Sequence, residues 1–115
     1  MPTVLTGVTQ NMKVAREEIF GPVSIIMKPF SSEEEVIDLA NDNSYGLCAT
    51  VWTKDLAKGI RFTNLLHAGT VNVNTQVLTN DIPWGGYKDS GIGKEGGEAG
   101  MLDYTLQKMV CIKIK

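Results

Sequence analysis

Three short strand-like runs separated by two amphipathic stretches limit most strongly how this chain can fold. The runs span residues 23–28, 47–52 and 70–74, and each is too short for an ordinary helix. Between them, residues 33–40 and 54–66 place apolar side chains at helical spacing. Strands that alternate with helices in this way predict an α/β fold, in which β-α-β-α-β crossovers build a parallel sheet.

Local signals mark the ends of the predicted helices. Ser32 and Glu35 have the spacing of a capping box, in which the Ser hydroxyl and the Glu carboxylate satisfy each other's free backbone N–H groups. Gly69 is expected to cap the end of the second helix, because glycine is favoured just past a helix C-terminus. Before the first run, residues 2–9 are expected to be extended and residues 10–18 to form one or two helical turns.

The chain loses its periodicity after residue 74. Residues 75–97 form a long Gly-rich loop, and loops of this length are usually functional or disordered. A short helix is expected around residues 98–104. Residues 106–114 end in an alternation of apolar side chains with Cys and Lys, which predicts a terminal strand with one apolar face. Such a strand is an edge that pairs with another strand.

Length and charge narrow the class of protein. A chain of 115 residues is one small domain. Its net charge of −2 comes without a basic block, which argues against a nucleic-acid partner. The apolar runs are too short for a membrane span, and the N-terminus lacks the pattern of a signal peptide. Cys48 and Cys111 lie far apart and form no metal-type pair, so a reduced, cytoplasmic protein is expected.

A sharp corner at residues 17–22 carries the most specific chemistry. Gly21 can adopt backbone angles closed to other residues, and Pro22 cannot continue a helix. The corner therefore presents a carboxylate, Glu18, and an aromatic ring, Phe20, two residues apart. Such a pair can hold a polyol and a flat ring together. The residues alone favour a different interpretation, in which Glu18 is a solvated charge at a helix end and Phe20 is a core residue.

The same corner resembles the Glu-x-Phe-Gly-Pro signature of the NAD(P)-dependent aldehyde dehydrogenase superfamily. Residues 43–47, 68–74 and 83–91 match further motifs of that family in order: Asn-Ser-Tyr-Gly-Leu, Ala-Gly-Thr-Val-Asn-Val-Asn and Pro-Trp-Gly-Gly-Tyr-Lys-Asp-Ser-Gly. The resemblance implies that the chain corresponds to the C-terminal portion of much longer enzymes. Residues 1–105 would be part of the catalytic domain, and residues 106–115 the strand through which subunits associate.

The resemblance also implies roles for three residues. Glu18 would accept hydrogen bonds from the hydroxyls of the nicotinamide ribose, because a carboxylate has two acceptor oxygens. Phe20 would pack near the nicotinamide ring of NAD or NADP and limit its position. Trp84 would line the aldehyde entrance, as in the betaine-aldehyde and aminoaldehyde branch, where an aromatic face can attract a cationic head group. The alternative for Trp84 is an aromatic that only packs the loop down.

The family's catalytic machinery lies upstream of the matched region. Its nucleophilic Cys, its oxyanion-stabilising Asn, its general-base Glu and its dinucleotide-binding domain have no counterpart here. Cys48 is expected mid-strand as a small buried hydrophobe, Cys111 lies in the tail, and the lone His67 is expected to be structural. Residues 91–96 match Gly-x-Gly-x-x-Gly, but a loop precedes them and no acidic residue follows at the required spacing, so they are interpreted as loop glycines.

We therefore expect no catalytic residue and no metal site in this chain, and no tight binding of NAD or NADP to the chain alone. Three interpretations remain open. The chain can be an inactive C-terminal piece of an aldehyde dehydrogenase, which would take an aldehyde only as part of a complete enzyme. It can be a self-associating α/β module that acts as a binding or interaction protein, or a piece without a selected function. A homo-oligomer is expected, formed through exposed strands and the tail 106–114.

Overall fold

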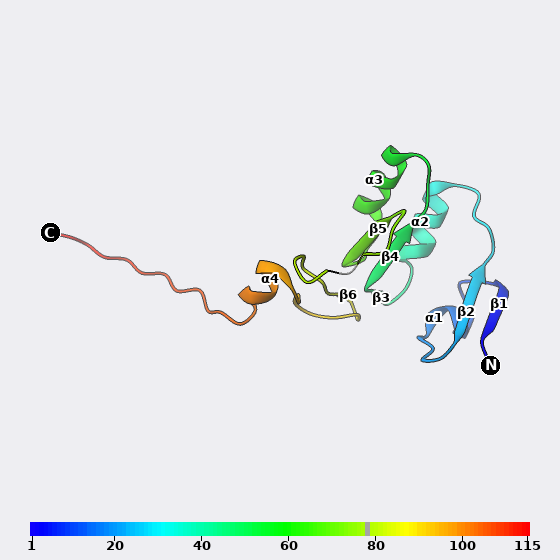
Figure 1. Ribbon diagram of the computed structural model, residues 1–115, viewed down its shortest axis with the longest axis horizontal. Helices are drawn as coiled ribbons and strands as arrows, with labels where there is room; N and C mark the ends of the chain where they lie inside the picture. Colours follow the sequence, from blue (N-terminus) through cyan, green and yellow to red (C-terminus); the bar gives the residue numbers. More distant parts are fainter. Residues whose placement is uncertain (78) are drawn as a thin grey trace.

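The strands form three two-stranded sheets in a computed structural model that describes residues 1–77 and 79–115. β1 (Thr3–Val8) pairs parallel with β2 (Val23–Met27), and β4 (Cys48–Val51) pairs parallel with β5 (Thr70–Val73). β3 (Tyr45–Gly46) and β6 (Tyr87–Lys88) form a short antiparallel pair. The helices of the described chain are α1 (Lys13–Arg16), α2 (Glu33–Asn41), α3 (Leu56–Leu65) and α4 (Gly97–Leu102). Figure 1 shows the β1–β2 pair at one end of the molecule and the C-terminal tail at the other.

The α/β class and the order β2-α2-β4-α3-β5 agree with the sequence, but the prediction of one continuous parallel sheet is wrong. β4 pairs with β5 as expected, whereas β2 pairs with β1 and shares no pairing with β4. An apolar run specifies a strand, but it does not specify which neighbour occupies each edge. The β1 segment, predicted only as extended, supplies the neighbour that β2 finds in this chain.

The two longer helices begin at capped N-termini. In α2, the Ser32 hydroxyl accepts from the Glu35 N–H at 3.1 Å, as the capping box predicts. The second bond of the capping box, from the Ser32 N–H to the Glu35 carboxylate, is replaced. The Glu35 carboxylate instead accepts from the N–H and the hydroxyl of Ser31, at 2.7 and 2.6 Å. In α3, the Asp55 carboxylate accepts from the Lys58 N–H at 3.1 Å.

The C-terminal turn of α2 is an attachment point for three other parts of the chain. Gln10 donates to the carbonyls of Leu39 and Asp42, at 3.1 and 2.6 Å. The Arg16 guanidinium donates hydrogen bonds to both oxygens of the Asp42 carboxylate, at 3.1 and 2.7 Å. From the Gly-rich loop, the Lys88 ammonium donates to the carbonyls of Asn41 and Asn43, at 2.7 and 3.0 Å. These carbonyls lie at the partially negative end of the helix, which favours cationic partners.

The Arg16–Asp42 pair should make stability depend on pH in one direction. The hydrogen bond from Arg16 is the main cause that holds the pKa of Asp42 below its ordinary value. A carboxyl whose pKa is lower in the folded chain contributes stability above its unfolded pKa and loses it as pH falls through its folded pKa. We expect Asp42→Asn to lower the urea midpoint slightly at pH 7, and the difference from the parent chain to shrink as pH falls below about 4.

Comparing Asp42→Asn with the parent chain separates the contribution of Asp42 to the pH dependence of stability from that of the other acidic groups. Glu33, held by Lys58 and Arg61, and Glu35 also have lowered pKa values and titrate alike in both chains. A difference between the two urea midpoints that stays constant from pH 7 to pH 3 would contradict the prediction.

The Gly-rich segment folds back on itself after β5. The backbones of Trp84 and Glu95 exchange two hydrogen bonds of 2.7 Å, which closes the loop around β6. Lys94 fixes the interior of this loop, because its ammonium donates to the Gly85 carbonyl at 3.1 Å and lies 4.9 Å from the centroid of the Tyr87 ring. The short helix expected around residues 98–104 is present as α4.

Gly69 has a different role from the predicted one. α3 ends at Leu65 with Leu66 at its C-cap, so the expectation that Gly69 caps this helix is wrong. The Gly69 N–H instead donates to the Gly46 carbonyl at 2.9 Å, just before β5 begins. A Cβ atom on Gly69 would lie 1.7 Å from the Gly85 carbonyl oxygen. Gly69 is therefore a position at which the loop backbone comes close to the start of β5.

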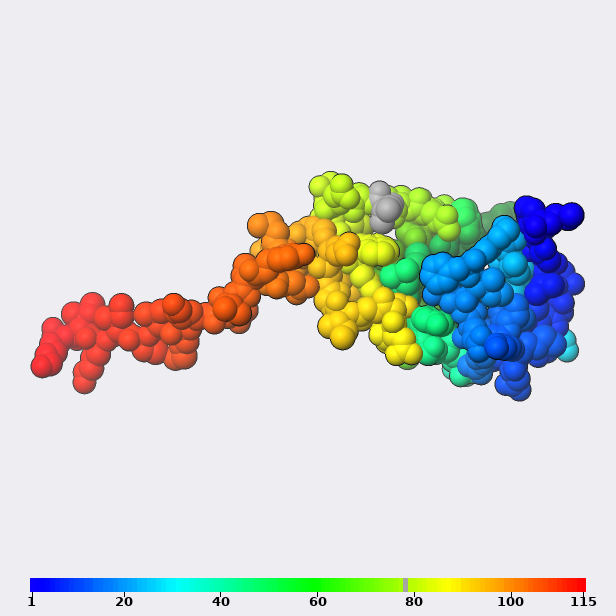
Figure 2. All heavy atoms as spheres, turned by 90° about the horizontal axis from the view of Figure 1, so that it is seen from below, coloured from blue at the N-terminus to red at the C-terminus, as the bar shows by residue number. Residues whose placement is uncertain are grey.

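The tail does not form the predicted strand. Residues 106–115 have no regular secondary structure and are exposed throughout. Figure 2 shows the tail projecting away from the body, which accounts for the long axis of 74 Å. A strand requires a hydrogen-bonded neighbour, and in the described part of this chain none lies beside the tail. The expectation of a C-terminal strand is therefore not met in the described chain.

The interior of the molecule is small. Among the described residues, Val8 and Phe62 are the apolar side chains classed as buried, with 3% and 9% of their surface exposed. Large apolar side chains such as Phe20, Trp52 and Phe30 remain 94%, 69% and 56% exposed. In residues 1–77 and 79–115, no helix has the length and apolar character needed to cross a membrane. The chain therefore leaves much apolar surface available to another polypeptide.

Candidate functional site

The corner at residues 17–22 is tight, but for a different reason from the predicted one. The Gly21 N–H donates to the Ile19 carbonyl at 2.9 Å, and the Val23 N–H donates to the Gly21 carbonyl at 2.8 Å. These successive short-range bonds turn the chain into β2. Gly21 is absent from the glycines with positive φ, so the turn does not use the left-handed conformation that glycine can adopt.

Both predicted cofactor residues lie at the surface of this corner. The Phe20 side chain is 94% exposed, so the interpretation of Phe20 as a core residue fails. The Glu18 side chain is also exposed. Two residues earlier, Arg16 is bound to Asp42, and this anchor holds the segment that carries Glu18 against α2. The corner thus offers a carboxylate and an aromatic ring that are free to contact something outside the chain.

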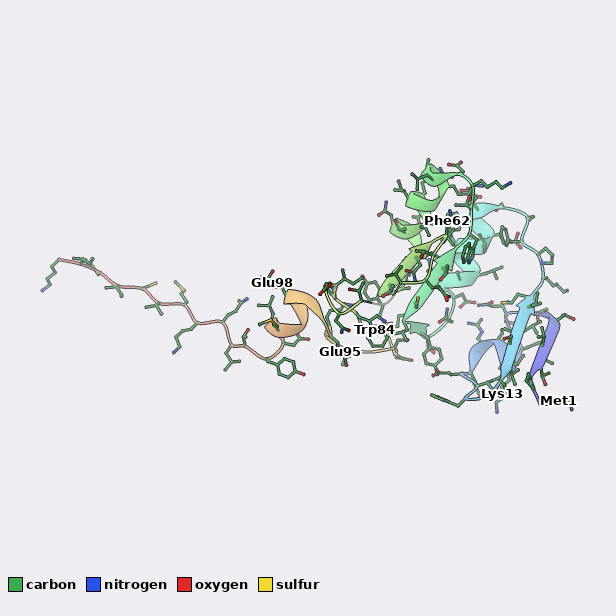
Figure 3. The ribbon with its side chains drawn as sticks, viewed as in Figure 1. Met1, Lys13, Phe62, Trp84, Glu95 and Glu98 are labelled. Carbon is green, nitrogen blue, oxygen red and sulfur yellow. The ribbon has the colours of Figure 1, made fainter. Side chains whose placement is uncertain are left out.

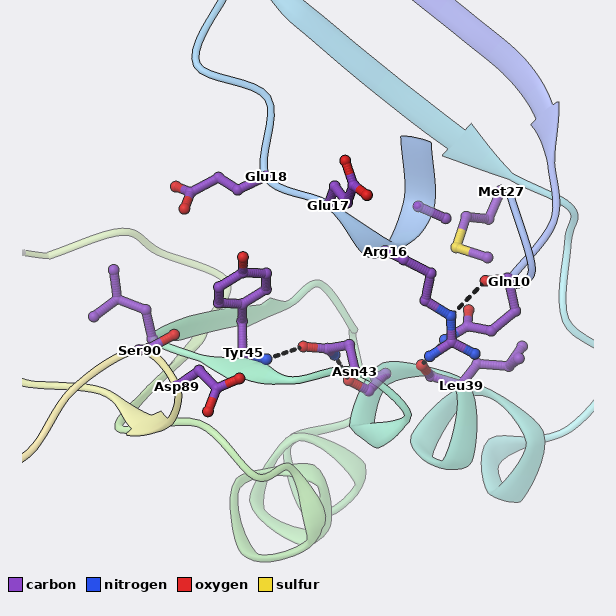
Figure 4. Close-up of a pocket in the computed structure, with 13 residues that line it drawn as sticks. Gln10, Arg16, Glu17, Glu18, Met27, Leu39, Asn43, Tyr45, Asp89 and Ser90 are labelled. Carbon is purple, nitrogen blue, oxygen red and sulfur yellow. Dashed lines mark hydrogen bonds between the residues drawn. The ribbon is translucent and has the colours of Figure 1, made fainter. Parts of the chain in front are cut away.

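Glu18 borders a hollow of about 550 Å³ between the β1–β2 unit and α2. Figure 4 shows β2 on one side of this hollow and α2 with the strand of Tyr45 on the other. Arg16 extends from α1 toward the end of α2 along one side of the hollow, and Asp89 and Ser90 line it from the loop that follows β6. The hollow therefore combines carboxylates and hydroxyls with the apolar side chains of Met27 and Leu39.

Trp84 lies in a separate place. Its ring borders one hollow of about 370 Å³ in the Gly-rich loop and another of about 200 Å³ beside β4 and β5. The smaller hollow also contains Cys48 and Asn72, whose amide nitrogen lies 3.5 Å from the Cys48 sulfur. Figure 3 labels Trp84 within this loop, beside Glu95 and away from the β1–β2 unit. Glu18 therefore lines the hollow of about 550 Å³, Phe20 projects from the same corner without lining it, and Trp84 borders other hollows.

The cysteines and the histidine do not form a catalytic group with one another. Cys48 is the first residue of β4 and is exposed, so the expectation of a buried mid-strand Cys is wrong. Cys111 is exposed in the tail, and His67 is exposed after α3. Within the described ranges, no group of three or more His, Cys, Asp and Glu side chains is placed to hold a metal ion.

Sequence reasoning missed the residues that hold the corner and the loop in place. Gln10, Arg16 and Lys88 all donate to the end of α2, although each is at least 26 positions away from its partner there. The available signal was the preference of helix C-termini for cations. That preference does not indicate which of the chain's Lys and Arg residues will arrive there.

The family follows from comparisons with known proteins. The sequence profile described as "Aldehyde dehydrogenase family" matches residues 1–110. Aldehyde dehydrogenase 1A1 of Mesocricetus auratus is 53% identical over 114 residues, and betaine aldehyde dehydrogenase of Brucella anthropi is 47% identical over 114 residues. The chain belongs to the aldehyde dehydrogenase family. Each match covers 98% of this chain but 23% of the relative, so the chain spans about a quarter of the length of these relatives.

Solved structures of aldehyde dehydrogenases contain a region with the same fold as this chain. An aldehyde dehydrogenase of Bacillus cereus in complex with NAD+ is 49% identical, with a TM-score of 0.93 over 99% of this chain and 23% of that one. An aldehyde dehydrogenase of Mycobacterium tuberculosis complexed with NAD+ is 46% identical, with a TM-score of 0.89 over 93% of this chain and 22% of that one. Related proteins therefore bind NAD+ with this local fold as part of a larger chain.

Proposed function

We propose that this chain supplies the C-terminal part of the catalytic domain of an NAD-dependent aldehyde dehydrogenase. In the proposed complete enzyme, an aldehyde is oxidised to a carboxylic acid, and residues 1–105 provide a wall of the active site. The exposed corner with Glu18 and Phe20 is the observation that carries the proposal. Both side chains face outward from a fixed turn, where a cofactor bound to the rest of an enzyme could meet them.

Orientation of the nicotinamide is the contribution proposed for this corner. The two oxygens of the Glu18 carboxylate would accept the two ribose hydroxyls, and the Phe20 ring would limit how far the nicotinamide can move. Correct placement of the ring against the reacting carbon lowers the barrier to hydride transfer. NAD is favoured over NADP because structurally similar aldehyde dehydrogenases are NAD+ complexes.

Trp84 is the residue proposed to contact the aldehyde. Its ring borders two hollows in and beside the Gly-rich loop, and relatives that match over nearly the whole chain include betaine aldehyde dehydrogenases. An indole face there would attract an aldehyde that carries a quaternary ammonium group. The cytoplasm is the proposed compartment, since a rat relative named as cytosolic is 52% identical.

A substitution of Glu18 tests the proposed function most directly. We expect a chimaera in which residues 1–114 replace the matched stretch of the hamster aldehyde dehydrogenase 1A1 to produce NADH from NAD+ and an aldehyde. In this chimaera, Glu18→Gln should lower kcat/KM for NAD+ by about 10- to 100-fold, because hydrogen bonds to a charged group contribute roughly 1.5–3 kcal/mol. The measurement is NADH absorbance under initial-rate conditions.

Glu17→Gln is the matched control for this experiment. Glu17 is the neighbouring carboxylate and is also exposed, but its ion pair is to Lys13 at 3.5 Å. The chain by itself should produce no NADH with any aldehyde. Equal kinetics for the two chimaera variants would contradict the role of Glu18. NADH production by the chain alone, lost in Cys48→Ala or Cys111→Ala, would overturn the proposal that the nucleophile lies elsewhere.

Self-association is the second candidate function, and the exposed tail favours it. Residues 106–115 extend away from the body without a partner in the described chain. Their alternating apolar side chains would cover one face of a neighbouring sheet. We propose that tails of this kind join copies of the chain into a homo-oligomer, whether or not the assembly catalyses a reaction.

A further inference from the structure

The short helix α1, which leads into the corner at residues 17–22, has little structure of its own to hold it in place. It spans four residues, none of them buried, and no side chain caps its N-terminus. An isolated helix of one turn is unstable in water, because its few hydrogen bonds do not offset the ordering of the backbone. The side of the corner that leaves α1 must therefore be fixed by contacts outside this helix.

Arg16, the last residue of α1, makes those contacts. Its guanidinium donates to both carboxylate oxygens of Asp42, at 3.1 and 2.7 Å, and its Nε donates to the Gln10 carbonyl at 2.7 Å. The Gln10 side chain in turn donates to the Asp42 carbonyl at 2.6 Å. We refer to Gln10, Arg16 and Asp42, which close a ring of hydrogen bonds, as the Arg16 clasp. The clasp ties the segment before α1 and the end of α1 to the end of α2.

The Arg16 clasp is better suited to fix a position than to stabilise the fold. The side chains of Arg16 and Asp42 are 35% and 58% exposed, and ion pairs this exposed contribute little to stability. A planar guanidinium holds several acceptor atoms in one fixed arrangement, whereas a Lys ammonium is a single point charge. The contribution of Arg16 is therefore geometric, because it fixes the direction in which the chain leaves α1.

Glu18 follows Arg16 by two residues, so the direction set by the clasp passes to Glu18 through a single intervening residue. That residue, Glu17, is extended, with φ of −107° and ψ of 143°, and its N–H donates to the Lys13 carbonyl at 3.0 Å. Figure 4 shows Arg16 reaching toward Gln10, while the Glu18 side chain points away from Arg16. Arg16 can therefore influence the Glu18 carboxylate through the backbone, without touching it.

We propose that Arg16 is a positioning residue for the nicotinamide cofactor and acts through the backbone on the Glu18 carboxylate. This inference rests on the proposed function, in which Glu18 accepts hydrogen bonds from the two ribose hydroxyls. Hydrogen bonds weaken steeply when their angle departs from linearity, and two bonds to neighbouring hydroxyls leave the carboxylate little freedom. Loss of the clasp would allow the corner to rotate, and both hydrogen bonds would weaken together.

A double-mutant cycle in the chimaera with the hamster aldehyde dehydrogenase 1A1 tests whether Arg16 acts through Glu18. We expect Arg16→Gln to lower kcat/KM for NAD+ by about tenfold, because a displacement of about 1 Å can cost up to about 100-fold in rate. The KM for the aldehyde should stay within about twofold of the parent value. In the Glu18→Gln background, Arg16→Gln should have no further effect, because the carboxylate that it positions is already absent.

Two single variants control for charge and for general damage to the segment. Arg16→Lys keeps the charge but loses the planar fork, and it should behave like Arg16→Gln rather than like the parent. Lys13→Gln removes the other ion pair of this segment, the exposed Lys13–Glu17 pair of 3.5 Å, and should keep the parent kinetics. Equal loss in Lys13→Gln, full activity in Arg16→Lys, or effects that multiply in the cycle would overturn the inference.

Hydrogen exchange in the intact 115-residue chain tests the clasp without any catalysis. The Glu17 N–H, which is bonded to the Lys13 carbonyl, should exchange at least about tenfold faster in Arg16→Gln than in the parent chain, because the turn opens more often. The Gly59 N–H, which donates to the Asp55 carbonyl at 3.0 Å in α3, should keep its rate. Faster exchange at both amides would indicate general destabilisation and would overturn the inference.

The outcomes separate this inference from the proposed function. If Glu18→Gln lowers kcat/KM for NAD+ but Arg16→Gln does not, the proposed function stands and the inference is overturned. If Glu18→Gln has no effect, the proposed role of Glu18 is overturned, whereas faster exchange at Glu17 alone in Arg16→Gln still supports the clasp as the contact that holds the corner. Unchanged exchange at Glu17 overturns the inference in either case.

Discussion

Replacing Gly69 by Ala should lower the free energy of unfolding by about 3 kcal/mol or more, because the added methyl has no space. A Cβ atom there would lie 1.7 Å from the Gly85 carbonyl oxygen and 2.8 Å from its carbon. Both are backbone atoms, so no side chain can rotate away. The loop that carries Trp84 would have to separate from the β4–β5 unit. The measurement is urea unfolding followed by circular dichroism and by tryptophan fluorescence.

Gly21→Ala is the control for the added methyl group. The nearest atom to a Cβ on Gly21 is in the Ile19 side chain at 3.9 Å, an ordinary contact distance, and its φ is not in the left-handed region. We expect this variant to unfold within about 0.5 kcal/mol of the parent chain. If both variants unfold at the same urea concentration, the contact between Gly69 and Gly85 does not limit the stability of the chain.

Placing two carboxylates on the apolar face of the tail should dissociate the proposed homo-oligomer. In Val110→Asp/Ile112→Asp, both charges would be buried against the neighbouring sheet, at a cost of several kcal/mol. Since 1.4 kcal/mol corresponds to a factor of ten, the dissociation constant should rise at least about a hundredfold. Light scattering across a micromolar concentration series measures this change as a loss of mass.

Met109→Asp/Cys111→Asp adds the same charge to the alternate positions of the tail. Because side chains alternate across a strand, these two face away from the apolar side, and the variant should keep the parent mass. Equal dissociation of both variants would indicate an effect of net charge rather than of one face. A parent chain that is a folded monomer at micromolar concentration would refute assembly through the tail.

Those features of the fold that depend on neighbours in sequence were predictable from sequence. The strand runs, the Ser32 cap and the helix after Asp55 all depend on residues within a few positions of one another. Strand neighbours could not be predicted in this way, because the sequence of β2 does not specify that β1 is the strand that pairs with it. The tail illustrates the same limit, since its alternating pattern specifies a face but cannot supply the strand that would hold it extended.

In the candidate site, too, local features could be predicted from the sequence and long-range contacts could not. The turn that carries Glu18 and Phe20 could be predicted from the short motif at residues 17–22, and the role of these two residues in binding a cofactor stays a prediction. The anchor of this turn could not be predicted, since Arg16 meets Asp42 across 26 positions of sequence. Gly69 was identified as important for the wrong reason. A local rule suggested a helix cap, whereas the requirement comes from Gly85, which reaches Gly69 only in the folded loop.

The last turn of α2 binds both the segment before Glu18 and the loop after Trp84. Arg16 and Lys88 are anchored to carbonyls within three consecutive residues, from Asn41 to Asn43. If this helix tilts, the two segments bound to it therefore move together. Surface substitutions along α2, far from both side chains, would then alter the proposed cofactor and aldehyde contacts in concert, and compensating changes would be expected on this helix.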